Sequence, residues 1–89
     1  MTVQINVVFD VAEDSPYYAP TLDAVRHGAD AAEVDLDLRV VRTTMIDDQF
    51  LDRPGDGVVL GPGTPYHSPI NAEQVIARAR QDGVPLVGT

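Results

Sequence analysis

The glycine- and proline-rich segment at residues 61–68 (GPGTPYHS) holds the residue types best suited to chemistry in this chain. It follows a short apolar run at residues 57–61 (GVVLG). Glycine lets a main chain approach a ligand closely, and rigid backbone N–H groups stabilise an oxyanion by about 3–4 kcal/mol per donor. A Pro-Gly pair is also a common turn signal. From these residues alone, an ordinary strand-to-helix turn is the simpler interpretation, and a ligand-binding loop is the alternative.

The two histidines and three tyrosines are the other candidates for acid–base or binding roles. His67 lies in the loop and could face a ligand there, whereas His27 lies in a helix-like segment, where a solvent-exposed histidine is expected. Tyr66 belongs to the same loop, and Tyr17 and Tyr18 begin a helical pattern, where core packing or partial exposure is the expected role. No motif connects either histidine to a nucleophile, so the sequence predicts no catalytic residue in this chain.

The charge of the chain argues against two classes of partner. Fourteen acidic residues face six basic ones, all arginine, and the formal net charge is −8. A field of that sign repels phosphate backbones and anionic lipids, so we expect neither nucleic-acid nor membrane binding. Four closely spaced aspartates could suggest a site for a divalent cation, but their spacing fits no calcium-binding loop. We therefore expect this segment to be solvated, and we expect neither a metal nor a cofactor. These acids are Asp47, Asp48, Asp52 and Asp56.

Length and cysteine content set further bounds. A chain of 89 residues forms at most one small domain, with little stability to spare. The absence of cysteine excludes disulfides and thiolate metal sites. The apolar run at residues 3–9 has no basic segment before it and no small-residue cleavage site after it, so we expect neither a signal peptide nor a membrane span, and a cytoplasmic location.

Strand-like and helix-like segments alternate along the chain. The first strand is almost entirely apolar, as in a strand buried on both faces, and the second alternates apolar and charged residues, as in a half-buried strand near a sheet edge. Apolar residues spaced three and four apart predict two long helices, and a short helical turn is expected inside the connector at residues 43–54. The expected strands are residues 3–9, 34–41, 57–61 and 84–87, and the expected helices are residues 17–32 and 70–82.

The second long helix carries the clearest end signals. Ser68 with Pro69 forms a plausible cap and first turn, and Asn71 followed by Gln74 is a rival start in capping-box form. Gly83 predicts a left-handed C-terminal cap. We expect the core face of this helix to consist of Val75, Ile76 and Ala79.

The order of these segments predicts an open, doubly wound parallel α/β sheet of the flavodoxin-like or Rossmann-like kind, with about four strands and two to three helices. Ligands of such sheets gather at the carboxyl ends of the strands. Asp10, Thr43, residues 61–68 and Thr89 all follow strand ends, so we expect them at that edge.

Residues 55–89 resemble part of a known family. The matching pieces are Asp56-Gly57 before the third strand, residues 62–66 (PGTPY) in the loop, residues 77–80 (ARAR) late in the helix and residues 83–89 (GVPLVGT) at the last strand. Together and in order, they resemble the class I glutamine amidotransferase domain of CTP synthase, most closely a stand-alone, CTP synthase-related group with some selenocysteine-containing members. Residues 18–29 and 38–44 resemble the first helix and second strand of these domains more loosely.

The resemblance implies a partial domain over residues 1–89. Gly63 and Thr64 would supply or shape the oxyanion hole, and the nucleophile would follow Thr89, with the histidine and glutamate of the triad still later. The chain itself is then expected to be inactive, with a glutamine-like small molecule as the ligand of the complete domain. The rest of the loop would lie near the site, namely Gly61, Pro62, Pro65, Tyr66 and His67.

Two other functions stay open at this point. One is a small α/β module that holds an anion or metabolite at a helix N-terminus. The other is an interaction protein that completes its sheet with another chain. The last expected strand, residues 84–87, is apolar and should present an edge of unpaired backbone N–H and C=O groups, so we also expect self-association through this edge.

Overall fold

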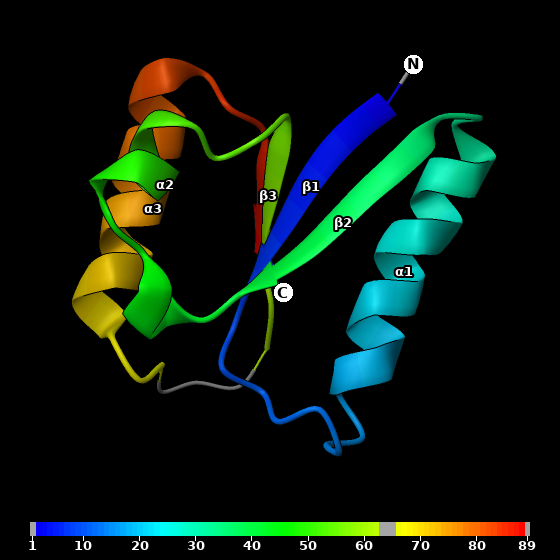
Figure 1. Cartoon of the computed structure of the whole chain (residues 1–89), viewed down its shortest axis with the longest axis horizontal. Helices are drawn as coiled ribbons and strands as arrows, with labels where there is room; N and C mark the ends of the chain where they lie inside the picture. The colour runs from blue at the N-terminus through cyan, green and yellow to red at the C-terminus, as the bar shows by residue number, and fades with distance from the viewer. Residues whose placement is uncertain (1, 63–65, 89) are drawn as a thin grey trace.

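The structure is a computed structural model of the chain, and it describes residues 2–62 and 66–88. Strands and helices alternate as the hydrophobic pattern predicts, and the connector folds into two short helical turns (Figure 1). Element bounds differ from the expected ones by no more than two residues. In chain order the elements are β1 (Thr2–Val8), α1 (Tyr18–Ala31), β2 (Asp35–Val41), the 3₁₀ turn η1 (Thr43–Met45), α2 (Asp48–Asp52), β3 (Gly57–Leu60), α3 (Pro69–Asp82) and β4 (Leu86–Gly88).

The four strands form one parallel sheet in the order β2-β1-β3-β4, which confirms the predicted open α/β fold. Seven residue pairs join β1 to β2, from Thr2 with Asp35 to Val8 with Val41. Shorter ladders join β1 to β3 and β3 to β4. The sheet order places β1 inside and β2 at an edge, as their apolar and alternating patterns indicate.

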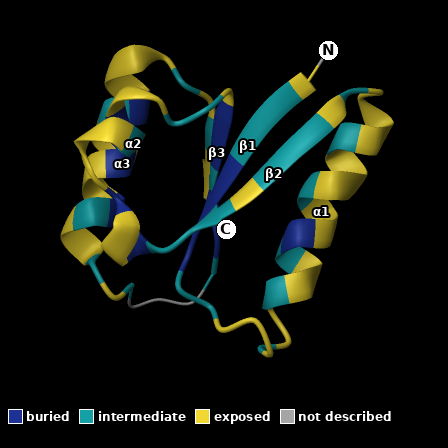
Figure 2. Cartoon of the chain, in the orientation of Figure 1, coloured by how far each residue is buried: buried dark blue, intermediate teal, exposed yellow. Residues whose placement is uncertain are grey.

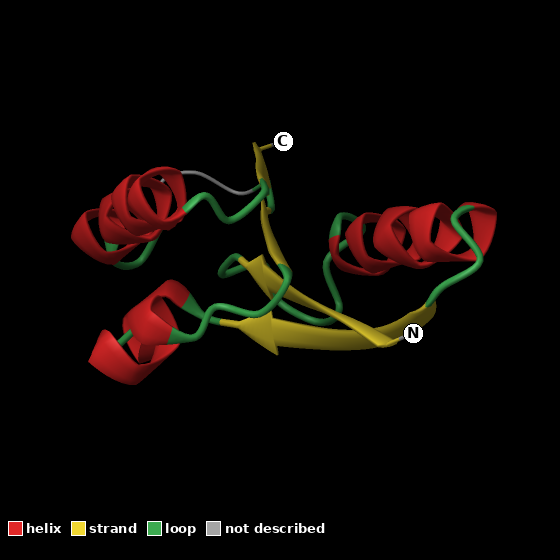
Figure 3. Cartoon of the chain, turned by 90° about the horizontal axis from the view of Figure 1, so that it is seen from above, coloured by secondary structure: helices red, strands yellow, loops and turns green. Residues whose placement is uncertain are grey.

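Helices cover the two faces of the sheet unequally. Viewed from above, α1 lies alone on one face, and α2 and α3 lie together on the other (Figure 3). The core is correspondingly split into two clusters. Val7, Phe9 and Leu22 are buried on the α1 side, and a larger cluster that includes Val8, Leu51, Val58 and Val75 is buried on the α2–α3 side.

Burial along β1 follows from this unequal cover. Its carboxyl half, Val7 and Val8, is completely buried, whereas Val3 and Ile5 are only half-buried (Figure 2). Both half-buried side chains lie on the α1 face, where the cover is incomplete. The near-continuous apolar run predicts a strand buried on both faces, and that expectation holds only for the half of β1 that leads to the carboxyl edge.

Helix α3 begins and ends as its sequence predicts, with one correction to its core face. The Ser68 side chain accepts a hydrogen bond from the N–H of Asn71, Pro69 occupies the first turn, and Gly83 adopts a left-handed φ of 71°. The expectation that Ile76 faces the core was wrong, because its side chain is 36% exposed. Ala72, which is one turn before Ile76 and 3% exposed, packs inward instead because it lies in line with Val75 and Ala79.

No helix in residues 2–62 and 66–88 is long and apolar enough to cross a membrane.

Candidate functional site

The carboxyl edge of the sheet is organised around the side chain of Asp10. This residue follows β1, and its side chain is only 3% exposed. Oδ1 accepts a hydrogen bond from the Thr43 N–H at 3.0 Å, and Oδ2 accepts from the Thr43 hydroxyl at 2.6 Å and from the His67 N–H at 2.8 Å. One carboxylate therefore joins the ends of β1 and β2 to the loop that follows β3.

The environment of Asp10 favours its charged form. Burial raises the pKa of this carboxyl, but the hydrogen bonds from the Thr43 hydroxyl and from the His67 and Thr43 N–H groups, with the nearby His67 ring, outweigh that effect. The net pKa of Asp10 lies below its ordinary value of 3.8. A carboxylate that accepts several hydrogen bonds is stabilised as the anion. The site thus contains a fixed, desolvated negative charge.

Thr43 is the second organising residue and is completely buried. Its hydroxyl donates to Asp10 and accepts a hydrogen bond from the Ser68 N–H at 3.0 Å. Its carbonyl accepts a hydrogen bond from the Asn71 side-chain amide at 2.9 Å. A single threonine at the end of β2 therefore fixes both the last residue of the loop and the first turn of α3.

The loop between β3 and α3 is closed on itself by a tyrosine. The Tyr66 hydroxyl donates a hydrogen bond to the carbonyl of Gly61 at 2.9 Å, which ties the end of the loop to its beginning. Burial first, and then the charge of Asp10, raise the pKa of Tyr66 above its ordinary value of 10.0, so its hydroxyl keeps its proton and donates. With the bonds to Asp10 and Thr43, both ends of the loop are held in place.

Gly61 is required at the start of the loop for a steric reason. A Cβ at this position would lie 2.6 Å from the nearest ring carbon of Phe9, which is completely buried. The ring of Phe9 stacks on Tyr18 with centroids 5.5 Å apart. The main chain therefore passes directly over an aromatic layer, and no larger residue fits without displacing it.

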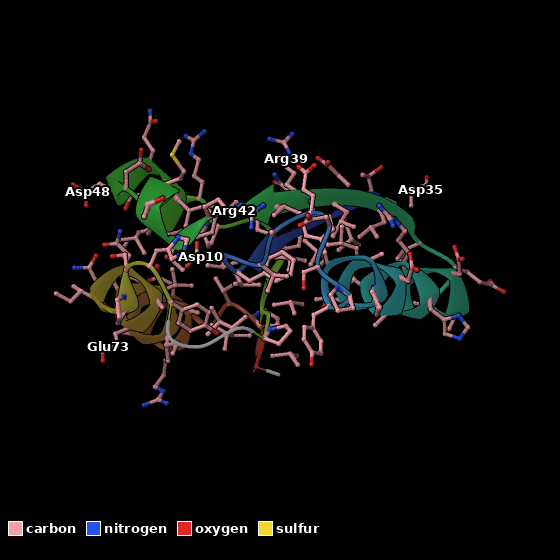
Figure 4. The ribbon with its side chains drawn as sticks, turned by 90° about the horizontal axis from the view of Figure 1, so that it is seen from below. Asp10, Asp35, Arg39, Arg42, Asp48 and Glu73 are labelled. Carbon is pink, nitrogen blue, oxygen red and sulfur yellow. The ribbon has the colours of Figure 1, made fainter. Side chains whose placement is uncertain are left out.

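Arg42 supports the same layer from the end of β2. Its guanidinium donates to the carbonyls of Phe9 and Val11 and lies 6.0 Å from the Phe9 ring centroid and 5.9 Å from that of Tyr18. Figure 4 views this edge of the sheet and shows Arg42 close to Asp10, between α1 and the α2–α3 side. Arg42 thus binds the segment after β1 to the end of β2.

The expected site residues divide into two groups. Gly61, Tyr66 and His67 lie at the carboxyl edge, where the sequence places them, and Pro62 lines the adjacent surface on the α1 side. Gly63, Thr64 and Pro65, which include both expected oxyanion-loop residues, lie outside the described residues, as does Thr89. The prediction for Gly63 and Thr64 therefore stays a prediction.

His67 faces the site through its backbone more than through its ring. The ring is 71% exposed, and its Nδ1 lies 3.9 Å from Oδ1 of Asp10. That separation is too long for a hydrogen bond but short enough for electrostatic attraction when the ring is protonated.

The sequence predicts Asp10 and Thr43 at this edge but not the hydrogen bonds that they make, and it indicates neither the role of Arg42 nor the bond from the Asn71 side chain to Thr43. The available signal was positional, because Asp10, Thr43 and residues 61–68 follow the ends of three parallel strands. Asn71 was considered only as a rival helix cap, whereas its amide reaches across to β2.

A scan against protein-family models and a search of curated proteins found no match to this chain. The geometry alone defines its class, an open parallel α/β domain with a polar carboxyl edge, where ligands of such sheets bind. Two features of the edge bear on its chemistry, namely a loop held at both ends and a buried carboxylate beneath it.

Proposed function

We propose that this chain forms the oxyanion-loop portion of a glutaminase domain similar to class I glutamine amidotransferases of the CTP synthase-related kind, without hydrolysing glutamine by itself. The observation that carries the proposal is the bracing of the two described ends of the loop, residues 61–62 and 66–68. Tyr66 bonds to Gly61 at one end, and Asp10 and Thr43 accept from the N–H groups of His67 and Ser68 at the other.

Bracing matters because oxyanion stabilisation depends on preorganised donors. Backbone N–H groups contribute most when they are held in position before the charge develops, so that no reorganisation is needed during the reaction. The described ends of this loop, residues 61–62 and 66–68, are anchored to buried residues at the carboxyl edge of a parallel sheet, which supports the proposal. A simple strand-to-helix turn needs neither a buried carboxylate nor a hydrogen bond from a tyrosine hydroxyl to the start of the loop.

The alternative function, a module for anions at the start of α3, receives less support. The ionised carboxylate of Asp10 accepts from the His67 N–H immediately before that helix. The side chain of Ser68 already accepts from Asn71 in the first turn. A second anion would face the charge of Asp10 at close range, which disfavours binding. The side-chain amide of glutamine is neutral before the reaction, so its binding carries no such penalty.

Glutamine binding by the purified chain tests the proposal. Two-dimensional amide NMR during titration with L-glutamine should shift the signals of Gly61, His67 and Ser68, with weak affinity on the order of 1 mM. D-glutamine is the matched control, because it has the same charge and composition but the opposite hand. If no loop amide shifts at ~50 mM L-glutamine, far above that ~1 mM constant, or if both enantiomers shift the loop equally, the proposal is wrong.

A further inference from the structure

Arg42 differs from the other arginines of the chain in how its charge is accommodated. Some of the others form ion pairs with aspartates, and the rest lie exposed to solvent. The paired ones are Arg26, Arg39 and Arg78, and the exposed ones are Arg53 and Arg80. Arg42 is half-buried, yet it forms no ion pair within residues 2–62 and 66–88. A charge that is partly withdrawn from water without an opposite charge beside it is costly.

Neutral groups hold the Arg42 guanidinium in a fixed orientation. Its Nη1 donates to the carbonyls of Phe9 and Val11, and its Cζ lies 6.0 Å from the ring centroid of Phe9 and 5.9 Å from that of Tyr18. Aromatic faces attract a cation without neutralising it, and carbonyl groups do the same. The guanidinium is therefore positioned before any ligand arrives, and its full positive charge is still available.

Two of the three nitrogens of this guanidinium are unused. In the part of the chain that the structure describes, Nη1 alone donates, and Nε and Nη2 donate to no protein group. No buried side-chain nitrogen or oxygen in that part lacks a hydrogen-bond partner, so Nε and Nη2 of Arg42 are in contact with solvent. Such a pair of parallel N–H donors matches the geometry of a carboxylate, which accepts two bonds from it at once.

The position of Arg42 relates it to the loop after β3. Arg42 follows β2 at the carboxyl edge of the sheet, where ligands of parallel sheets bind (Figure 4). The Phe9 ring beneath its guanidinium is also the ring that a Cβ on Gly61 would meet at 2.6 Å. Because both groups lie against one ring, Cζ of Arg42 is within about 10 Å of that Cβ position at the start of the loop.

We propose that Arg42 binds the α-carboxylate of the glutamine whose side-chain amide lies at the loop, an inference that rests on the proposed function. In an extended glutamine the α-carboxyl carbon and the side-chain amide carbon are about 5 Å apart. A bidentate pair of guanidinium and carboxylate adds about 4 Å between Cζ and the carboxyl carbon. One glutamine bound to Arg42 therefore reaches the start of the loop at Gly61.

The charges of the chain favour an amino acid over a simple anion as the ligand of Arg42. The net charge of −8 repels a free anion, whereas a zwitterionic amino acid carries no net charge and is not repelled. Asp10, the buried acid of the same edge, accepts its hydrogen bonds from Thr43 and His67 and forms no ion pair with Arg42. The guanidinium thus remains free for the carboxylate of a ligand, and its partial burial strengthens that attraction.

A pair of ligands tests the proposal on the unaltered chain. L-glutaminamide keeps the side chain and the hand of L-glutamine but has a neutral amide in place of the α-carboxylate. In amide NMR titrations we expect L-glutamine to shift the loop signals and the Nε–H signal of Arg42, and to bind about tenfold or more tightly than L-glutaminamide. At pH ~6.5 L-glutaminamide is a cation, which the acidic chain attracts, so this preference runs against the overall field.

Substitutions of two arginines separate carboxylate binding from net charge and from bracing. Arg42→Gln should lower the affinity for L-glutamine about tenfold or more and leave that for L-glutaminamide unchanged. Arg39→Gln removes the same charge from an exposed position on β2 and should preserve the preference. Arg42→Lys, which keeps the charge but lacks the fork, should reduce the preference and serves if Arg42→Gln does not fold by circular dichroism.

The outcomes distinguish this inference from the function on which it rests. If L-glutamine shifts the loop signals but the unaltered chain binds L-glutaminamide equally well, the carboxylate is not recognised and the inference is wrong, whereas the proposed function stands. The same conclusion follows if the preference for L-glutamine survives in both Arg42 variants. If L-glutamine shifts no loop signal, the proposed function fails and the inference fails with it.

Discussion

The carboxylate of Asp10 accepts a hydrogen bond at 2.8 Å from the backbone N–H of His67, which lies 57 residues further along the chain. This bond spans the sheet from the end of β1 to the loop that precedes α3. Because the same carboxylate also accepts two bonds from Thr43, it couples three strand ends through one buried charge. The stability of the fold and the position of the loop should therefore depend on the same residue.

Asp10→Asn should destabilise the chain by about 1–3 kcal/mol, since it removes charge-assisted hydrogen bonds and places an amide N–H group against backbone donors. Urea unfolding followed by circular dichroism would measure the change. Asp30→Asn on the exposed surface of α1 is the matched control and should change the free energy of unfolding by less than about 0.5 kcal/mol. Equal effects at both positions would show that Asp10 acts only through net charge.

The stability of the chain should fall at acidic pH in a way that depends on Asp10. Its folded pKa lies below 3.8, so its contribution to folding is fully present above that unfolded value and is lost as pH falls through the folded pKa. The free energy of unfolding, measured from neutral pH to below 3.8, should therefore decline less steeply in Asp10→Asn than in the parent chain. Parallel curves for the two proteins would contradict this account.

Asp10 and Thr43 should act as a unit. Thr43→Val keeps the shape of the side chain but removes the hydroxyl that donates to Asp10 and accepts from Ser68. A double-mutant cycle with Asp10→Asn should give a coupling energy of about 0.5–3 kcal/mol, as expected for residues in one hydrogen-bond network. If the changes in the free energy of unfolding caused by the two single substitutions simply add in the double mutant, the Asp10–Thr43 contact contributes little by itself.

Gly61→Ala should be destabilising because its Cβ would collide with the ring of Phe9. Overpacking of this kind costs about 1–3 kcal/mol, and each kcal/mol lowers the melting temperature by about 4–8 °C in a domain of this size. Gly88→Ala is the control, since a Cβ there meets open space. Thermal unfolding of the two variants at equal concentration should differ clearly, and equal melting temperatures would show that Phe9 moves aside without cost.

The purified chain should release no ammonia from glutamine above background. It contains no cysteine, and no motif supplies the general base of a glutaminase triad. Loss of a whole triad leaves only the residual acceleration of the oxyanion hole, roughly 10³ to 10⁴ over water in proteases. A coupled assay with glutamate dehydrogenase would detect ammonia. Turnover that persists through repeated purification would overturn the assignment of no catalytic residue.

Local features of this protein could be read from the sequence because local interactions determine them. The apolar spacing of α1, the Ser68–Pro69 start of α3 and the left-handed end at Gly83 each depend on residues within one or two turns. Alternation in β2 indicated an edge strand, and β2 lies at an edge. The open parallel α/β class follows from the order of such elements.

Only the tertiary structure decided which of these residues meet. The bonds from Thr43 and His67 to Asp10 join residues 33 and 57 positions apart, and the sequence pattern contains no signal for partners at such separations. Ile76 shows the same limit, because helical spacing allows it on the core face but the packing against α2 and the sheet selects Ala72 instead. Periodicity tells which face of an element is apolar, whereas the contacts between elements depend on how all the faces fit together.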